Sequence, residues 1–356
     1  MAGDFWINMY NVLMIGSKNI KGNSYGGLEA LLRNYNALRK IGFVEYLNLY
    51  DYKIGKYKRR INFYLLGRHY ILSKQNELHL LKICENKDIV CIEQSHFGKI
   101  AKIIKQKYPS KKVITFFQNC QYEYSKAENP FNLLRQKVVH FNEKCACKYS
   151  DKIIVLNKRD EDALYCLYKR KADAVIPISL ENRSINFNKN KIENKPIALF
   201  LGSNFFANNH GLKWFIKNVL PYVDIKLKIV GNGMDKVDLP KSDKLEIIGY
   251  VENLEECMQN ADFMIFPIFK GSGMKVKTCE ALMHGKNIIG TGEAFMGYDV
   301  DFEKVGAKCE TVEEFIKAIN EFPQRFTNKF NEYSRSVFLE KYTDDVTFKQ
   351  FAEMFE

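Results

Sequence analysis

The densest group of residues that could carry chemistry lies in FPIFKGSGMKVKTCEALMHGKNIIGTG, residues 266–292. A predicted strand ends at Pro267, and the loop Gly271-Ser272-Gly273 opens a predicted helix over 273–284. The N-terminus of a helix offers unpaired N–H groups and the positive end of a dipole, so this connection is suited to bind a phosphate.

Charged side chains follow in the first turns of that helix. Lys275 and Lys277 could neutralise a diphosphate, and Glu280, three residues after Lys277 and on a similar face, could accept hydrogen bonds from sugar hydroxyls. The alternative is an ordinary strand–loop–helix connection with solvated lysines. Spacing alone does not decide between the two interpretations.

Two further candidates lie in the first half of the chain, each at the end of a predicted strand. His96 follows the strand 87–94 and either lines a ligand site or is structural. Gln118 ends the strand 111–119, and its amide could hydrogen-bond a sugar hydroxyl although it carries no proton charge.

The elements that must position these residues alternate along the whole chain. Short apolar runs alternate with amphipathic helical stretches, which predicts an α/β protein with parallel sheets and helices on both faces. The polar stretch 179–196, rich in Asn and Lys, interrupts this alternation and is the best candidate linker. We expect domains at 1–190 and 191–330, followed by a helical, aromatic segment at 331–356 that packs back on the first domain.

Length and composition agree with two globular domains. The chain has 356 residues, and no run of eighteen apolar residues occurs in it. Its beginning is a poor signal peptide, and its nine cysteines are scattered irregularly, so a reduced, cytoplasmic protein is expected. Cys145 and Cys147 form a C-x-C pair without a partner at zinc spacing, so we expect no metal site.

The positive charge is concentrated in the first half. Residues 1–195 carry 35 Lys and Arg against 18 Asp and Glu, whereas residues 196–356 carry 19 against 24. This asymmetry indicates that the first half faces something anionic. No zinc finger, RNA-recognition signature or basic region joined to heptads is present, so a nucleic-acid partner is not expected.

Residues 266–292 resemble the donor-binding signature of glycosyltransferase family 4, in the branch that reads Gly-x-Gly-x-(Lys/Arg)-(Ile/Val)-Lys-x-x-Glu-Ala. Similar stretches occur at 25–42, 150–164, 201–215, 228–233 and 248–267, so the resemblance covers nearly the whole chain. It implies a GT-B fold, in which two Rossmann-like domains face each other across a cleft. It also implies retaining sugar transfer from a nucleoside-diphosphate sugar, without a metal or another cofactor.

The resemblance also implies roles for particular residues. Glu280 matches the second glutamate of the family's paired-glutamate motif, which binds the nucleotide ribose, and Lys277 is a counter-charge for the diphosphate. Gln118 and His96 are the further catalytic candidates. The donor-binding positions implied are Gly26, Gly27, Gly202, Asn208, Tyr250, Val251, Gly271, Ser272, Gly273, Met274 and Lys275.

The sequence departs from the family pattern at three places. Ser272 stands at the position of the first motif glutamate, which leaves sugar recognition open. Asn208 and Asn209 occupy the stretch where the family has a basic residue, and Gln118 stands near the position of the family's histidine. A glutamine suits a mechanism in which the leaving diphosphate itself takes the acceptor's proton.

The expected function is therefore transfer of a sugar to a glycan or lipid-linked glycan, in synthesis of a bacterial surface polysaccharide. The alternative is a non-catalytic GT-B scaffold that binds lipid or a partner protein. A nucleotide-dependent oxidoreductase is disfavoured because GSKNIKGNSYGG, after the first strand, lacks the Gly-x-Gly-x-x-Gly pattern. A metal-using transferase would need an Asp-x-Asp at a strand end, and none is convincing.

An anionic membrane surface is a further expected partner, with the protein peripheral on the inner face of the plasma membrane. Two basic stretches, 53–60 and 99–112, lie in the first half. In the second, Ile100, Ile103 and Ile104 share one helix face among lysines, and such a helix could lie on a headgroup surface. The competing interpretation is a soluble acceptor and a solvated lysine face.

Overall fold

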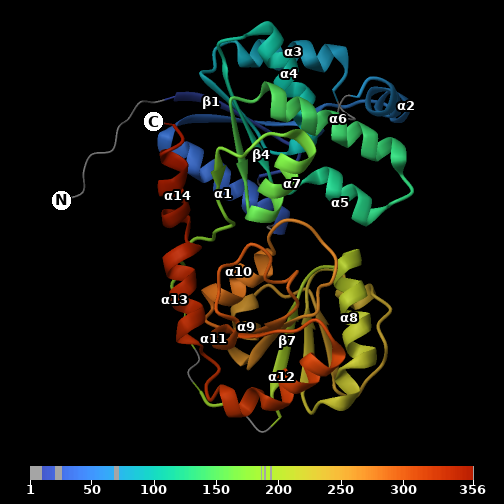
Figure 1. The fold of residues 1–356 in the computed structure, drawn as a ribbon, viewed down its shortest axis with the longest axis vertical. Helices are drawn as coiled ribbons and strands as arrows, with labels where there is room; N and C mark the ends of the chain where they lie inside the picture. Colours follow the sequence, from blue (N-terminus) through green and yellow to red (C-terminus); the bar gives the residue numbers. More distant parts are fainter. Residues whose placement is uncertain are drawn as a thin grey trace, which may run out of the picture. The chain divides into compact units, whose positions relative to one another are not determined.

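The computed structural model describes residues 10–20, 26–67, 72–185, 187, 190–192 and 195–355. The chain forms two compact units, Met1–Pro177 together with Thr347–Glu356, and Ile178–Val346 (Figure 1). Each unit contains one six-stranded sheet, and all the strand pairs in both sheets are parallel. The predicted α/β class with two doubly wound parallel sheets is confirmed.

The sheet of the first unit has the strand order β2-β1-β3-β4-β5-β6. Its strands read as apolar runs because helices cover both faces, so inward and outward side chains are both buried. Val12 and Met14 of the first strand pack on one face, whereas Leu13 and Ile15 pack on the other. The strands are β1 (Tyr10–Gly16), β2 (Gly42–Asn48), β3 (Ile89–Ile92), β4 (Lys112–Phe117), β5 (Lys152–Val155) and β6 (Ala174–Val175).

Helices of the first unit connect these strands and supply the rest of its core. The α-helices are α1 (Gly26–Ile41), α2 (Lys56–Arg60), α3 (Lys74–Cys84), α4 (Gly98–Lys107), α5 (Gln121–Glu128), α6 (Leu133–Tyr149) and α7 (Lys158–Tyr168). The described part of the unit also contains two 3-10 turns, η1 (Leu49–Asp51) and η3 (Ser95–Phe97). A π-helical turn, η2 (Ile61–Leu65), continues α2.

The α4 helix corrects one prediction. Ile100, Ile103 and Ile104 are all buried in the first unit's core, at 1%, 9% and 0% exposure. The apolar face that could have met a membrane covers the sheet instead, as expected of a crossover helix in a doubly wound fold. The interpretation of 99–112 as a helix lying on a headgroup surface is therefore wrong.

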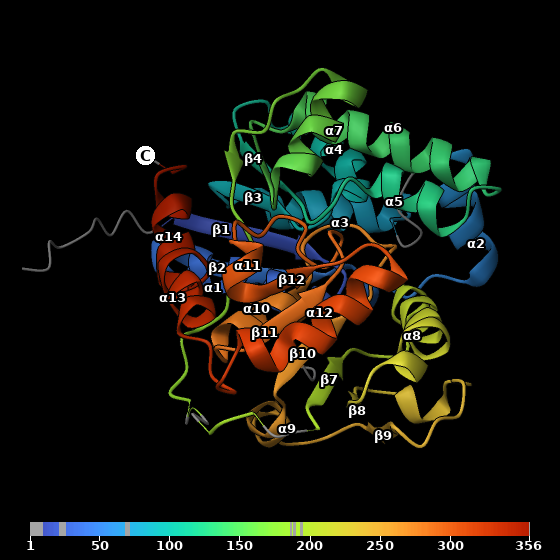
Figure 2. The ribbon, with the colours of Figure 1, turned by 60° about the horizontal axis from the view of Figure 1, so that its bottom comes forward.

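The sheet of the second unit has the order β12-β11-β10-β7-β8-β9, and Figure 2 shows these strands side by side. Its strands are β7 (Ile197–Leu201), β8 (Lys226–Val230), β9 (Leu245–Gly249), β10 (Phe263–Phe266), β11 (Asn287–Gly290) and β12 (Gly306–Lys308). Its helices are α8 (Phe206–Asn218), α9 (Leu254–Asn260), α10 (Val276–Met283), α11 (Phe302–Val305), α12 (Val312–Arg325) and α13 (Glu332–Lys341), with 3-10 turns η4 (Leu220–Tyr222) and η5 (Met234–Lys236).

The boundary between the units lies earlier than the predicted 190/191. Ile178 and Leu180 belong to the second unit, because the Ile178 amide donates to Met274 Sδ at 3.4 Å and the Leu180 amide donates to the Tyr342 carbonyl at 3.0 Å. Both side chains are buried. Part of the predicted linker 179–196 lies outside the described residues.

The C-terminal segment 331–356 is two helices rather than one. The helix α13 ends before Tyr342, and Thr343 forms an isolated parallel β-bridge with Leu180. The last helix, α14 (Asp344–Ala352), then carries Phe351 into the first unit's core, where its ring stacks on Phe116 at 5.7 Å between centroids. Only the residues from Thr347 on join the first unit.

Candidate functional site

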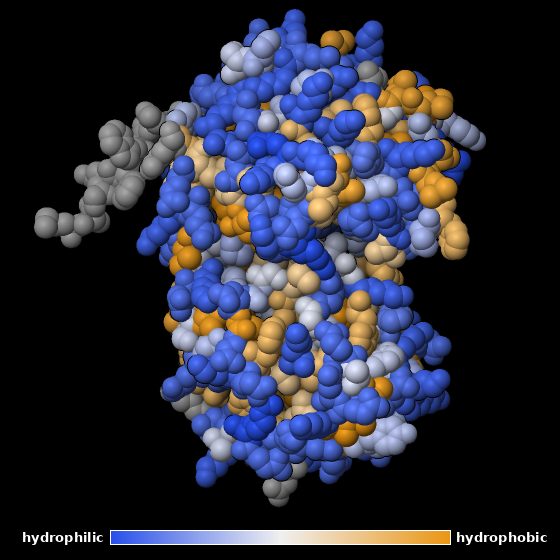
Figure 3. Space-filling model, viewed as in Figure 1, coloured by the Kyte–Doolittle hydropathy of each residue, from blue (hydrophilic) through white to orange (hydrophobic). Residues whose placement is uncertain are grey.

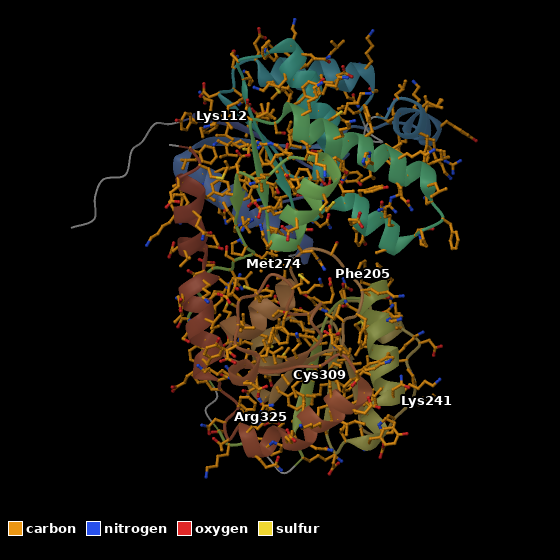
Figure 4. All side chains as sticks on the ribbon, in the orientation of Figure 1. Lys112, Phe205, Lys241, Met274, Cys309 and Arg325 are labelled. Carbon is orange, nitrogen blue, oxygen red and sulfur yellow. The ribbon has the colours of Figure 1, made fainter. Side chains whose placement is uncertain are left out.

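The second unit's sheet reverses its strand order between β7 and β10. The chain first adds β8 and β9 on one side of β7, and then places β10 on the other side. In doubly wound sheets, ligands bind outside the carboxyl ends of the strands at such a reversal. Two loops leave this edge, residues 202–205 before α8 and residues 267–275 before α10. Figure 4 shows Phe205 and Met274, one from each loop, at the same end of the unit.

Lys277, in the first turn of α10, links the two helices that follow these loops. Its Nζ donates to Asn208 Oδ1 of α8 at 2.8 Å, and it lies 4.5 Å from the centre of the Phe200 ring. Burial lowers the pKa of Lys277 to about 7, and the nearby Glu280 carboxylate opposes that shift. An added anion would favour the charged form of a half-buried ammonium group such as this one.

Gly202 makes room for this arrangement. A Cβ atom at position 202 would lie 2.6 Å from Lys277 Nζ and 2.8 Å from Asn208 Nδ2. The Asn208 amide is fixed in turn, because its Nδ2 donates to the Ser203 carbonyl at 2.8 Å. Gly202, Asn208 and Lys277, which the resemblance assigned to the donor site, thus lie together in the structure.

The loop before α10 is held by its own charged pair. Gly273 has a φ of +59°, a left-handed conformation that favours glycine, and Lys275 is the residue that precedes the helix. Lys275 Nζ lies 2.6 Å from Glu293 Oε1 and also donates to the Gly273 carbonyl at 3.1 Å. In the structure, Lys275 therefore stabilises the loop by contacts with Glu293 and the Gly273 carbonyl. The helix begins at Val276, later than the predicted 273.

Glu293 is a residue that the sequence interpretation missed. It follows β11, the strand next to β10, so it leaves the same edge of the sheet as the Gly271–Lys275 loop. Its position a few residues after a buried apolar strand is the only signal that the sequence carried. Its partner is 18 positions away along the chain, which spacing within a helix does not reveal.

The remaining donor-site candidates of the second unit lie in α10, in the loop before it and after β9. Glu280 is half-buried in α10 and near enough to influence the charge of Lys277. Ser272 is half-buried, and its carbonyl accepts from Lys275 Nζ at 3.4 Å. Tyr250, 62% exposed, and Val251 follow β9, which is separated from β10 by β8 and β7.

The first unit has a reversal of its own, between β1 and β3. Gly26 and Gly27 form the first turn of α1, which follows β1. Glu93, directly after β3, is fully buried and accepts hydrogen bonds from Asn34 Nδ2 and Gln118 Nε2, both at 3.1 Å. Burial raises the pKa of Glu93 to about 7, although these hydrogen bonds and the charge of Arg33 oppose the shift. The sequence interpretation did not select Glu93.

The two catalytic candidates of the first unit differ in their surroundings. Gln118 is half-buried after β4, with one amide hydrogen directed at Glu93. His96 lies in the turn η3 against the Phe97 ring, with centroids 4.2 Å apart, and burial lowers the pKa of His96 to about 4. The imidazole is therefore neutral near pH 7. The catalytic roles assigned to both residues stay predictions.

Neither a cluster of metal-ligating side chains nor a membrane-spanning helix occurs among the described residues. Among the described residues, no three His, Cys, Asp or Glu side chains are grouped so that they could hold a metal ion. No described helix combines the length and the apolar character needed to cross a bilayer. All nine cysteines are free, and Cys145 of the C-x-C pair is buried.

Two doubly wound parallel sheets in separate units define the GT-B class of fold. Residues 195–324 match the family described as group 1 glycosyl transferases. This stretch contains the Gly202, Asn208 and Lys277 arrangement. The family match and the structural matches below support a glycosyltransferase enzyme.

Solved structures share the fold over nearly the whole chain. Anabaena Alr3699/HepE in complex with UDP matches with a TM-score of 0.69 at 12% identity, covering 97% of this chain and 99% of that one. A glycosyltransferase from Rickettsia africae ESF-5 matches with a TM-score of 0.66 at 13% identity, covering 98% of both chains. The lipopolysaccharide outer core galactosyltransferase WaaB, in its apo form, matches with a TM-score of 0.66 at 14% identity, covering 97% and 98%. A comparison with curated proteins gave no match.

Proposed function

We propose that this chain is a retaining family 4 glycosyltransferase that moves a sugar from a nucleoside-diphosphate sugar to a glycan or lipid-linked glycan acceptor, in bacterial surface polysaccharide synthesis. The observation that carries the proposal is the hydrogen bond between Lys277 and Asn208 at the second unit's strand-order reversal. It holds an ammonium group beside the N-terminus of α10, where a diphosphate would also meet backbone N–H groups.

Uridine diphosphate is the nucleotide that we propose for the donor. The Anabaena structures similar to this chain contain UDP, UDP with glucose, and UDP-glucose. In this chain, the diphosphate would lie between the Gly271–Gly273 loop and Lys277, and the ribose would bind Glu280. The proposal assigns the diphosphate's charge to helix amides and a lysine rather than to a divalent ion.

The reaction breaks the bond between the anomeric carbon and the diphosphate oxygen, and forms a bond from that carbon to an acceptor hydroxyl on the same face. The negative charge that develops on the leaving diphosphate is assigned to Lys277 and the α10 amides. The leaving diphosphate takes the acceptor's proton. Gln118 is assigned a hydrogen bond to a sugar hydroxyl rather than a proton transfer.

Calorimetric titration with UDP, in buffer containing a chelator, tests the donor site. UDP is expected to bind wild-type protein with or without the chelator, and Lys277→Met should weaken binding. Lys213→Met, an exposed lysine of α8, is the matched control and should bind as the wild type does. Binding that required magnesium or manganese, or that was unchanged in Lys277→Met, would contradict this assignment.

Release of UDP from UDP-glucose tests whether the site is catalytic. Glu280→Gln should lower kcat/KM, with a loss of transition-state stabilisation of about 2–4 kcal/mol, because a charged hydrogen-bond acceptor is lost. Glu313→Gln, at an exposed position of α12, is the control. Tight UDP binding with no turnover of any UDP-sugar would favour the non-catalytic scaffold instead.

A further inference from the structure

An exposed apolar surface lies on the first unit. We call it the α2–α6 surface, after the two helices that carry it. Figure 3 shows apolar side chains gathered on this side, over α2 and the loop between α5 and α6. Its members and their exposed fractions are Tyr57 (81%), Ile61 (49%), Leu65 (78%), Phe131 (92%), Leu133 (62%), Leu134 (65%) and Phe141 (40%).

The two groups of side chains form one continuous surface. Asn142 Nδ2 of α6 donates to the Gly67 carbonyl, just beyond η2, at 3.1 Å. A Cβ atom at Gly67 would lie 3.2 Å from the Phe141 ring, so the end of η2 rests directly on α6. Figures 1 and 2 both show α2 beside α5 and α6.

The exposed side chains share helix faces and are not scattered singly. Tyr57, Ile61 and Leu65 are spaced by four residues along α2 and η2, which places them on one side of that helix. Phe63, on the opposite side, is buried and anchors the helix to the unit. Apolar groups collected on one face in this way mark an interaction site, whereas isolated ones do not.

The charge around the α2–α6 surface is predominantly positive, although Glu128 of α5 is exposed and pairs with Arg135 of α6 at 2.5 Å. Between Asp51 and Glu77, and again between Glu128 and Glu143, the sequence contains no acidic residue. The whole first unit contains 32 Lys and Arg against 18 Asp and Glu. The exposed basic residues are Lys53 before α2, Lys56, Lys58, Arg59 and Arg60 on α2, and Lys137, Lys144 and Lys148 on α6.

We propose that the α2–α6 surface docks onto the headgroup region of an anionic lipid bilayer. Aromatic and aliphatic tips can enter the boundary between headgroups and acyl chains, while surrounding lysines and arginines meet lipid phosphates. The inference deepens the proposed function, because a lipid-linked acceptor would be presented at such a bilayer. It moves the membrane contact from α4, whose isoleucines are buried, to α2 and α6.

Sedimentation with vesicles tests this surface. Wild-type protein should sediment with vesicles of phosphatidylcholine mixed with phosphatidylglycerol, but not with phosphatidylcholine alone, and recovery should fall as salt rises. Reversing Lys58, Arg59 and Arg60 to Glu should weaken binding by at least about tenfold, since each basic residue near an acidic leaflet adds attraction. Replacing Tyr57, Leu65 and Phe131 together by Ser should also abolish recovery.

Matched controls test whether vesicle binding depends on the α2–α6 surface rather than on basic or exposed apolar side chains anywhere in the protein. Reversing Lys213, Lys217 and Lys241 to Glu removes the same charge from exposed positions of the second unit. Replacing Leu78 and Tyr222, 61% and 68% exposed, by Ser removes exposed apolar groups elsewhere. Both controls should sediment as the wild type does, and all variants should retain wild-type melting and UDP binding.

Three results would overturn the inference. These are equal recovery with neutral and anionic vesicles, wild-type recovery of both surface variants, and a wild-type dimer that the Tyr57, Leu65 and Phe131 replacement converts to a monomer. The dimer result would assign the surface to a second copy of the chain. Vesicle binding without UDP binding would refute the proposed function alone, and UDP binding without vesicle binding would refute only the docking surface.

Discussion

Lys277 is a half-buried cation whose close neighbours are mostly uncharged. Its hydrogen-bond acceptor, Asn208, is neutral, and the other groups against its Nζ include the rings of Phe200 and Phe266, at 4.5 Å and 5.8 Å. Burial therefore lowers the pKa of Lys277, with only Glu280 raising it. A bound diphosphate would favour the ammonium form and raise the pKa again.

This linkage predicts that UDP binding weakens as pH rises. The free protein has a Lys277 pKa of about 7, so above that pH binding must take up a proton. Affinity should fall by up to about tenfold per pH unit until the pKa of the complex is reached. Calorimetric titrations across this range should show the slope in wild type and in Lys213→Met, but not in Lys277→Met. Parallel profiles for all three proteins would refute the linkage.

The buried Glu93 carboxyl predicts a pH dependence of the free energy of unfolding. Its folded pKa of about 7 is above the ordinary 4.5, so its stabilising contribution is complete below pH 4.5 and is lost as pH rises through 7. The loss should amount to about 3 kcal/mol of the free energy of unfolding. Urea unfolding should show this loss in wild type and not in Glu93→Gln. The exposed Glu313→Gln should follow wild type, and a wild-type slope in Glu93→Gln would contradict the assignment.

At the scale of elements, the close crossing of α4 and α6 sets the shape of the first unit's outer layer. Gly98 begins α4 at the point where it meets α6. A Cβ atom there would lie 2.0 Å from the Asn142 carbonyl oxygen and 2.5 Å from the Ala146 nitrogen. Both are backbone atoms, so no side-chain rotation could relieve the overlap. The crossing therefore depends on glycine.

Gly98→Ala is accordingly expected to destabilise the protein. Alanine normally improves a helix by about 0.5–1 kcal/mol over glycine. Overpacking against fixed backbone costs about 1–3 kcal/mol. This cost outweighs the helix gain, so the net effect on the free energy of unfolding should be a decrease. Thermal unfolding should show a lower Tm for Gly98→Ala. Gly55→Ala is the control, because nothing lies within 4 Å of its Cβ position, and its cost should stay below about 1 kcal/mol. An unchanged Tm in Gly98→Ala would show that the helices can separate.

At the scale of the whole molecule, the chain's end completes the core of its beginning. Phe351, Met354 and Phe355 belong to the same buried cluster as Val12 and Phe116. The first unit is therefore built from two segments far apart in the sequence, and its core is complete only when α14 is in place. The second unit is contiguous, running from Ile178 to Val346.

Truncating one ring should show this dependence. Phe351 is 1% exposed and stacks between Phe116 and Phe355, at 5.7 Å and 5.4 Å. Phe351→Ala should reduce the free energy of unfolding by about 3–5 kcal/mol, measured by urea denaturation. Phe131→Ala, 92% exposed in the same unit, should change it by less than about 0.5 kcal/mol. Equal effects of the two changes would mean that α14 does not stabilise the first unit.

The sequence by itself determined the local elements and the fold class. Strands such as Ile89–Ile92 and Phe263–Phe266 are apolar throughout because both sheet faces are covered, and that pattern is visible without coordinates. The Gly271–Gly273 loop before a helix was likewise readable, since turn glycines and helix periodicity are local properties. These signals placed Lys277 among the candidates, whereas Asn208 and Gly202 were implied by the resemblance to glycosyltransferase family 4.

Only the tertiary structure decided which of those residues meet. Lys277 and Asn208 are 69 positions apart, and Glu93 and Asn34 are 59 apart, so strand order rather than spacing brings each pair together. The structure also decided which side of α4 is buried, because periodicity identifies an apolar face but not what covers it. A sequence pattern describes each element separately, whereas a site at a strand-order reversal exists only once the strands are arranged in a sheet.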